Sequence, residues 1–119
     1  MRLQDVLSHT QARPISRNPD LKREVRSGFA SDLMSDVLCY DVAQGLLITG
    51  LTNPQIIRTA EMADVAAILV VRGKVPPSET VDLAEQLNIP MIGTNLIMLE
   101  TCGRLFAAGL APCKRQNGD

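Results

Sequence analysis

Two glycines and two cations follow the most apolar segments of this sequence, where they could together hold an anion. The run Leu46 to Thr49 ends at Gly50, and the run Ala66 to Val71 is followed by Arg-Gly-Lys at positions 72 to 74. A glycine lets the backbone approach a ligand closely, and the free amides at a helix start favour negative charge. The sequence therefore predicts a binding site for a phosphate-bearing small molecule, such as an adenine nucleotide, formed by Gly50, Thr52, Asn53, Arg72, Gly73 and Lys74.

The same residues are also ordinary turn residues. Glycine after a strand and asparagine before a helix are typical of tight turns, and Arg72 and Lys74 would be hydrated on any surface. The sequence contains no GxGxxG, GxxxxGK[ST] or GxSxG motif, so the strong signatures of phosphate loops and nucleophilic serines are missing. The residues alone leave both interpretations of these turns open.

Candidate catalytic residues do not form a set. Asp32 and Asp36 lie four residues apart, but acids near a helix start more often complement its dipole. Ser31 has no histidine partner, because the single histidine, His9, is remote in sequence. With one histidine and no CxxC pair, a zinc site of the usual spacing is excluded. We therefore predict no enzyme activity, cofactor or metal site, and a phosphotransfer enzyme is the least favoured alternative.

The elements that would position these turns alternate between strands and helices. Leu46 to Thr49 and Ala66 to Val71 have the pattern of strands buried on both faces. Between them, Asn53 can cap a helix that begins at Pro54. Two buried strands joined by an amphipathic helix form a crossover unit with parallel strands.

The rest of the chain repeats this unit. A more polar strand over 24–30, expected near a sheet edge, leads into a long helix from Ser31 to Gln44. A helix over 79–88 and a strand over 89–94 follow. The predicted fold is α/β, a mostly parallel four-stranded sheet with packed helices. In such sheets ligands bind beyond the carboxyl ends of the strands, where the turns described above would meet.

The last predicted helix, from Asn95 to about Ala108, is apolar over more than one face. Such a helix is covered on two sides, and a second copy of the chain is the simplest cover, since two-fold dimers are the commonest oligomers. We therefore expect a homodimer; the alternative is an assembly protein whose last helix docks a protein partner without any ligand. Residues 1–110 would form a single domain and residues 111–119 a polar, frayed C-terminal tail.

Composition sets limits on partners and location. The 119 residues carry a net charge of −1 and only three aromatic side chains, which argues against nucleic acid and acidic membranes as partners. The N-terminus lacks the charged head and apolar core of a signal peptide. No apolar run approaches the roughly 20 residues needed to span a bilayer. A cytoplasmic protein is expected.

Three stretches give the chain a family resemblance: SDLMSDVL from Ser31, GLLITGLTNPQIIRTAEMADVAAILVVRGK from Gly45, and LAEQLNIPMIGTNLIMLETCGRL from Leu83. From about Arg2 to Leu110 the chain resembles a free-standing member of the DRTGG domain family. The resemblance implies an α/β regulatory, nucleotide-sensing or dimerising module, with a redox or metabolic enzyme as a partner. Gly50 and Gly73 correspond to turn glycines of that pattern. The name-giving acidic–basic pair has no match, because Leu51-Thr52-Asn53 follows Gly50 and the next strand ends at Val71-Arg72-Gly73.

Overall fold

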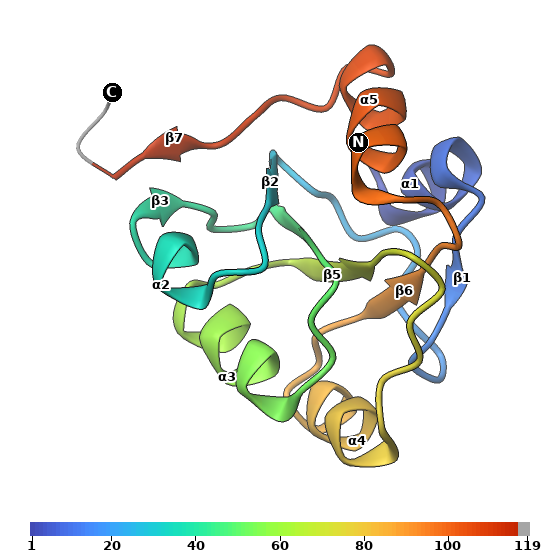
Figure 1. Ribbon diagram of the computed structural model, residues 1–119, viewed down its shortest axis with the longest axis vertical. Coiled ribbons are helices and arrows are strands. Elements are labelled where there is room, and N and C mark those ends of the chain that lie inside the picture. The colour runs from blue at the N-terminus through green and yellow to red at the C-terminus, as the bar shows by residue number, and fades with distance from the viewer. Residues whose placement is uncertain (117–119) are drawn as a thin grey trace.

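A five-stranded sheet with the order β1-β6-β5-β4-β2 divides the protein into two helical layers (Figure 1). The structure is a computed structural model that describes residues 1–116. The strands of this sheet are β1 (Arg13–Pro14), β2 (Gly28–Ala30), β4 (Leu46–Thr49), β5 (Ala67–Val70) and β6 (Met91–Gly93). Strands β2, β4, β5 and β6 are parallel, and β1 pairs antiparallel with the end of β6. The expected mostly parallel α/β fold is confirmed, with β1 as an additional strand.

Helices cover both faces of the sheet. Helices α1 (Leu3–Thr10) and α5 (Met98–Ala107) pack on one face, and α3 (Pro54–Met62) and α4 (Ser78–Gln86) on the other. The central strands β4 and β5 are buried along their whole length. Leu46 and Ile48 pack into the core beneath α1 and α5, whereas Leu47 packs beneath α3 and α4. This alternation of side chains explains why both strands are continuously apolar.

The predicted long helix from Ser31 to Gln44 is wrong. Only the single turn α2 (Met34–Val37) forms, followed by a short strand β3 (Tyr40–Asp41). The Ser31 hydroxyl accepts a hydrogen bond from the Leu33 amide at 3.0 Å, which closes a local turn instead of capping a long helix. Val37 is buried, but Leu33 remains 57% exposed, so the apolar pattern does not become one continuous buried face.

The segment expected as a polar tail is hydrogen-bonded to the domain as far as residue 116. The Gly28 amide donates to the Ala111 carbonyl at 2.8 Å, and the Cys113 amide donates to the Gly28 carbonyl at 3.2 Å. Farther along, β7 (Lys114–Arg115) pairs antiparallel with β3. Residues 117–119 of the predicted tail lie outside the described residues.

The last helix begins three residues later than predicted. Residues 95–97 form the turn before α5, and α5 itself ends one residue earlier than expected. Within residues 1–116, no helix combines the length and the apolar character that spanning a membrane requires.

Candidate functional site

The carboxyl ends of the four parallel strands lie along one edge of the sheet. We call the residues that follow them, 31–32, 50–53, 72–74 and 94–95, the carboxyl rim. The strand register places Thr49 opposite Val70, and Val70 opposite Gly93, so the turns leave the sheet at the same level. A hydrogen bond of 2.9 Å from the Gly73 amide to the Thr94 carbonyl joins two of them directly. Parallel pairing therefore gathers the predicted turns at one edge.

Asp32 is the acid of the carboxyl rim. One oxygen of its carboxylate accepts hydrogen bonds from the Thr49 hydroxyl at 2.9 Å and from the Gly50 amide at 2.7 Å. The Gly50 hydrogen bond is the largest cause that lowers the pKa of Asp32; Thr49, Arg72 and Lys74 act in the same direction, and burial opposes them. Asp32 is therefore ionised at neutral pH and ties the end of β2 to the end of β4.

Sequence reasoning assigned Asp32 to a helix start and missed this role. Its position did carry a signal, because it follows a predicted strand just as Gly50 and Arg72 do. Acids that immediately follow a parallel strand reach the rim whether or not a helix comes next.

Arg72 lies across Gly50. Arg72 adopts a left-handed backbone conformation, with φ of 64°, and its amide donates to the Leu96 carbonyl at 2.9 Å. A Cβ atom on Gly50 would collide with the guanidinium of Arg72, so the glycine makes room for that side chain. The guanidinium lies 3.8 Å from the second carboxylate oxygen of Asp32, with both side chains about two-fifths exposed (42% and 43%). The close approach at Gly50 is thus made by the protein's own arginine.

Thr52 and Asn53 hold the neighbouring helices. The Asn53 side chain accepts a hydrogen bond from the Ile56 amide at 3.3 Å and caps α3, with Pro54 at its first position. The Thr52 carbonyl accepts a hydrogen bond of 2.7 Å from the hydroxyl of Thr80, which is buried on α4. These contacts are those of a structural turn, and they fix where α3 and α4 begin relative to the sheet.

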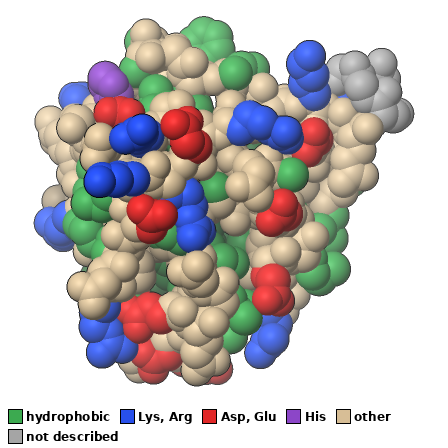
Figure 2. Space-filling model, turned by 180° about the vertical axis from the view of Figure 1, so that it is seen from behind, with side chains coloured by type: hydrophobic (Ala, Val, Ile, Leu, Met, Phe, Trp, Pro, Cys, Tyr) green, Lys and Arg blue, Asp and Glu red, His purple; other side chains and the backbone are tan. Residues whose placement is uncertain are grey.

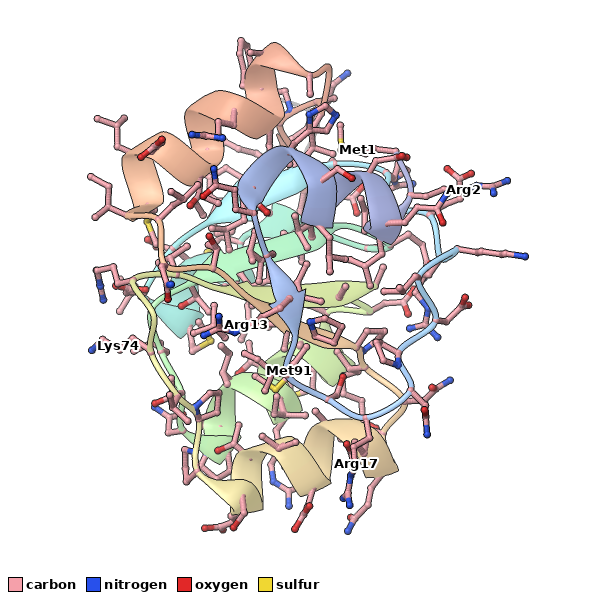
Figure 3. All side chains as sticks on the ribbon, turned by 90° about the vertical axis from the view of Figure 1, so that its right-hand side faces the viewer. Met1, Arg2, Arg13, Arg17, Lys74 and Met91 are labelled. Atoms are coloured by element: carbon pink, nitrogen blue, oxygen red, sulfur yellow. The ribbon has the colours of Figure 1, made fainter. Side chains whose placement is uncertain are left out.

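Gly73 and Lys74 face a different part of the rim from Arg72. They line a pocket of about 160 Å³ together with Arg13, Gly93, Thr94, Asn95 and neighbouring apolar residues. We call it the Arg13–Lys74 pocket. In Figure 3, Arg13 lies on β1 near the centre and Lys74 at the left edge. Gly73 has φ of +65°, and a Cβ there would lie 2.9 Å from the side-chain oxygen of Asn95, so glycine is the favoured residue at this turn.

Arg13 was missed from the sequence because it falls in a segment interpreted mainly as a connecting loop. Its register partner on β6 is Gly93, which brings it to the carboxyl end of that strand. Among residues 1–116, no acidic side chain forms a salt bridge with Arg13 or Lys74. Within residues 1–116, the predicted site residues therefore divide into Arg72, which pairs with Asp32, and Gly73 with Lys74, which line a pocket with an Arg13 that forms no salt bridge.

A larger pocket lies at the opposite edge of the sheet. This open concavity of about 470 Å³ lies between residues 16–20 and the end of α4. Its cation is fully engaged, because the Arg17 side chain donates to Glu85 at 2.8 Å and the Arg17 amide donates to the same carboxylate at 2.6 Å. This pairing raises the pKa of Arg17 and lowers that of Glu85. In Figure 3, Arg17 lies at the bottom right, away from Lys74. The pocket offers no free positive charge to an anion.

The remaining concavity of interest is apolar. A groove of about 370 Å³ lies between the edge strand β2, helix α5 and residues 110–112. We call it the α5 groove. Leu99 and Phe106 beside it are 80% and 69% exposed. Figure 2 shows hydrophobic side chains gathered at the top of the molecule, the end at which α5 lies in Figure 1. Charges of both signs are spread over the rest of that view.

The described residues contain no group of three or more His, Cys, Asp or Glu side chains placed to hold a metal ion. The polar groups of the carboxyl rim are cations, backbone amides, hydroxyls and the carboxylate of Asp32. Cations and amides are the groups that can donate hydrogen bonds to an anion.

Comparison with known proteins bears on the fold. No family model matches this chain, and no curated protein matches it either. A solved structure with a similar fold contains the CBS and DRTGG domains of the regulatory region of Clostridium perfringens pyrophosphatase, with a TM-score of 0.73 and 19% sequence identity. The match covers 98% of this chain and 51% of the other, so this chain spans about half the length of that neighbour. The DRTGG-like α/β fold expected from the sequence is thereby confirmed.

Proposed function

We propose that this protein is a non-catalytic, cytoplasmic regulatory module that senses a phosphorylated small molecule, such as an adenine nucleotide, at its carboxyl rim. The observation that carries the proposal is the charge of that edge of the sheet. Arg13, Arg72 and Lys74 bring three cations to it, against the single carboxylate of Asp32. The carboxyl edge is where open α/β sheets bind their ligands. An anion therefore fits this edge better than a neutral or cationic ligand.

The structural neighbour is consistent with this class of ligand. Its regulatory region was solved in complex with an activator, diadenosine tetraphosphate. A regulatory role without catalysis also agrees with the state of Asp32, the acid of the carboxyl rim. Hydrogen bonds hold its carboxylate ionised. A carboxylate engaged in this way is a poor general base. We accordingly propose binding without turnover.

Calorimetry tests the proposal directly. ATP, ADP and AMP are titrated into the wild type and into a triple variant that carries Arg13→Gln, Arg72→Gln and Lys74→Gln. We expect at least one nucleotide to bind the wild type and the triple variant to bind it at least tenfold more weakly, because charge-assisted phosphate contacts are lost. Lys22→Gln is the matched control, since Lys22 is exposed and adjoins Arg23, which binds carbonyls at the opposite edge of the sheet. Absence of binding to the wild type would refute the proposal.

The module would act as a homodimer through α5. The exposed Leu99 and Phe106 are separated by Gly103, and a Cβ at Gly103 would meet nothing within 4 Å. A glycine inside a helix costs stability, and no neighbour among residues 1–116 fills the space that a side chain here would occupy. It would let a second α5 cross closely at this point. Glu100 and Arg104, which pair at 2.7 Å, also present both signs of charge, so a two-fold copy would meet its own complement.

Sedimentation or light scattering over a range of concentrations tests the dimer. We expect the wild type to dimerise and a Leu99→Ser, Phe106→Ser double variant to be monomeric. Met62→Ser is the control, because Met62 is equally exposed but lies on α3, on the other face of the sheet. A wild type that stays monomeric at every concentration removes this part of the proposal.

The α5 groove also favours a second function, that of an assembly module with no ligand. In that case α5 docks a protein partner, and a redox or metabolic enzyme is the class we propose from the family resemblance. The two functions differ in the calorimetry described above. An assembly module gives no heat with nucleotides, yet loses its partner when Leu99 and Phe106 are replaced.

A further inference from the structure

The carboxyl rim offers two places for a negative charge, and they are not equivalent. The first is the Gly50 amide beside Arg72, and the second is the Arg13–Lys74 pocket. The place beside Gly50 and Arg72 already holds an anion, the carboxylate of Asp32. This carboxylate accepts a hydrogen bond from the Gly50 amide at 2.7 Å and lies 3.8 Å from the Arg72 guanidinium. A ligand phosphate would have to displace this carboxylate or lie beside it, at a cost in like-charge repulsion.

At the second place the competition is weaker, because Lys74 is attracted to Asp32 only at longer range and forms no salt bridge with it. Arg13 and Lys74 come from two separate elements, β1 and the turn after β5, and no salt bridge among residues 1–116 neutralises either of them. Both side chains are exposed at the mouth of the pocket. An arginine and a lysine that line the same pocket suit a phosphate group, the arginine through paired N–H donors and the lysine as a point charge.

The shape of the pocket limits what enters it. Ile15 and Gly93 both line it, and a Cβ on Gly93 would lie 2.7 Å from the end of the Ile15 side chain, so the glycine allows this close contact. The volume of about 160 Å³ is below the roughly 300 Å³ at which pockets begin to hold whole drug-sized ligands. A phosphate group fits within it, whereas the sugar and base of a nucleotide would lie outside, over the rest of the carboxyl rim.

We infer that the Arg13–Lys74 pocket, and not the Gly50–Arg72 turn, holds the phosphate group of the ligand. This inference rests on the proposed function and makes it more specific. It assigns much of the energy of phosphate binding to Arg13, a residue that the sequence pattern does not single out. Arg72 then has a structural role, as the partner of Asp32.

Single substitutions separate the two places. AMP, ADP and ATP are titrated by calorimetry into the wild type, Arg13→Gln, Lys74→Gln and Arg72→Gln at one fixed ionic strength, with adenosine as the probe that lacks phosphate. We expect Arg13→Gln and Lys74→Gln each to raise the dissociation constant about tenfold or more, because each removes a charge-assisted contact. Arg72→Gln should change it less than about threefold, and adenosine should not bind measurably.

The outcomes are distinguishable. If Arg72→Gln abolishes nucleotide binding while Arg13→Gln and Lys74→Gln retain it, the inference is overturned and the proposed function stands. If the wild type binds none of the nucleotides, both fail together. Arg13 and Lys74 are exposed and without salt bridges among residues 1–116, so replacing them should not destabilise the fold. An unchanged thermal melting curve for each variant would show that any loss of nucleotide binding does not come from unfolding.

Discussion

Replacing Asp32 with asparagine tests how the carboxyl rim is held together. The amide oxygen of asparagine can still accept from the Thr49 hydroxyl and the Gly50 amide, but the negative charge is lost. The change therefore isolates the contribution of charge from that of hydrogen-bond geometry. The two hydrogen bonds are 2.9 and 2.7 Å long, and the ion pair with Arg72 is long, at 3.8 Å.

The expected magnitude follows from these contacts. A hydrogen bond to a charged group is worth about 1 kcal/mol more than a neutral one, so two such bonds give an upper value of about 2 kcal/mol. Because 43% of the Asp32 side chain is exposed, water competes and roughly half of this value applies. The exposed ion pair with Arg72 adds little. We expect Asp32→Asn to lower the free energy of unfolding by about 1 kcal/mol at pH 7.

The pH dependence gives a stricter test of the same reasoning. The folded-state pKa of Asp32 is lowered, so its contribution is present above the unfolded-state pKa, which is about 4, and is lost as the pH falls through the folded-state value. The difference between wild type and Asp32→Asn should thus be constant from pH 7 to about pH 5 and should shrink below that range. Urea unfolding at a series of pH values measures it.

Asp36→Asn is the matched control for this experiment. Asp36 is an exposed acid on α2, four residues away, and its side chain makes no hydrogen bond among the described residues. Its substitution should change the free energy of unfolding by less than about 0.5 kcal/mol. A wild-type advantage over Asp32→Asn that persists undiminished at pH 3, or is absent at pH 7, would show that the Asp32 charge does not stabilise the rim.

Three further substitutions test the packing around the site, each by urea unfolding of dilute protein. Gly103→Ala should raise the free energy of unfolding by about 0.5 to 1 kcal/mol, because the added Cβ meets nothing within 4 Å and alanine has the higher helix propensity. A lower free energy of unfolding would mean that this side of α5 is not open. Thr80→Val should lower the free energy of unfolding by about 1 to 2 kcal/mol, since the Thr52 carbonyl loses the hydrogen bond of 2.7 Å from the Thr80 hydroxyl. An unchanged value would show that this hydrogen bond does not link the start of α3 to α4. Gly73→Ala should lower the free energy of unfolding by about 1 to 2 kcal/mol, because φ is +65° and the Cβ approaches Asn95; a neutral result would refute the left-handed turn.

The centre of the fold could be predicted from the sequence because its signals are local and agree with one another. The β4 and β5 runs are too apolar for any exposed position, and between them Asn53 and Pro54 mark the start of α3. The parallel pairing of β4 with β5 and the placement of Gly50 and Gly73 at one edge then follow from the crossover connection.

The edges of the fold depend on contacts that no local pattern encodes. Residues 31–44 have helical spacing of apolar side chains, but β3 pairs there with β7, more than seventy residues later in the chain. That pairing favours extended backbone at Tyr40 over a longer helix. In the same way, Arg13–Pro14 has almost no strand signal, and only its pairing with β6 brings Arg13 to the carboxyl rim.

The internal pair of Asp32 and Arg72 explains why the turn at Gly50 is a weaker candidate for anion binding than its sequence indicates. The acidic–basic pair that names the resembled family is absent after Gly50 in the sequence, yet an acid and a base reach Gly50 from two other segments, 31–32 and 72–74. The carboxylate satisfies the amide that a bound anion would use, and the guanidinium is attracted to that carboxylate. Within residues 1–116, Arg13 and Lys74 are the cations at this edge that form no salt bridge, so residues that look like ordinary edge and turn residues in the sequence become the better candidates for binding.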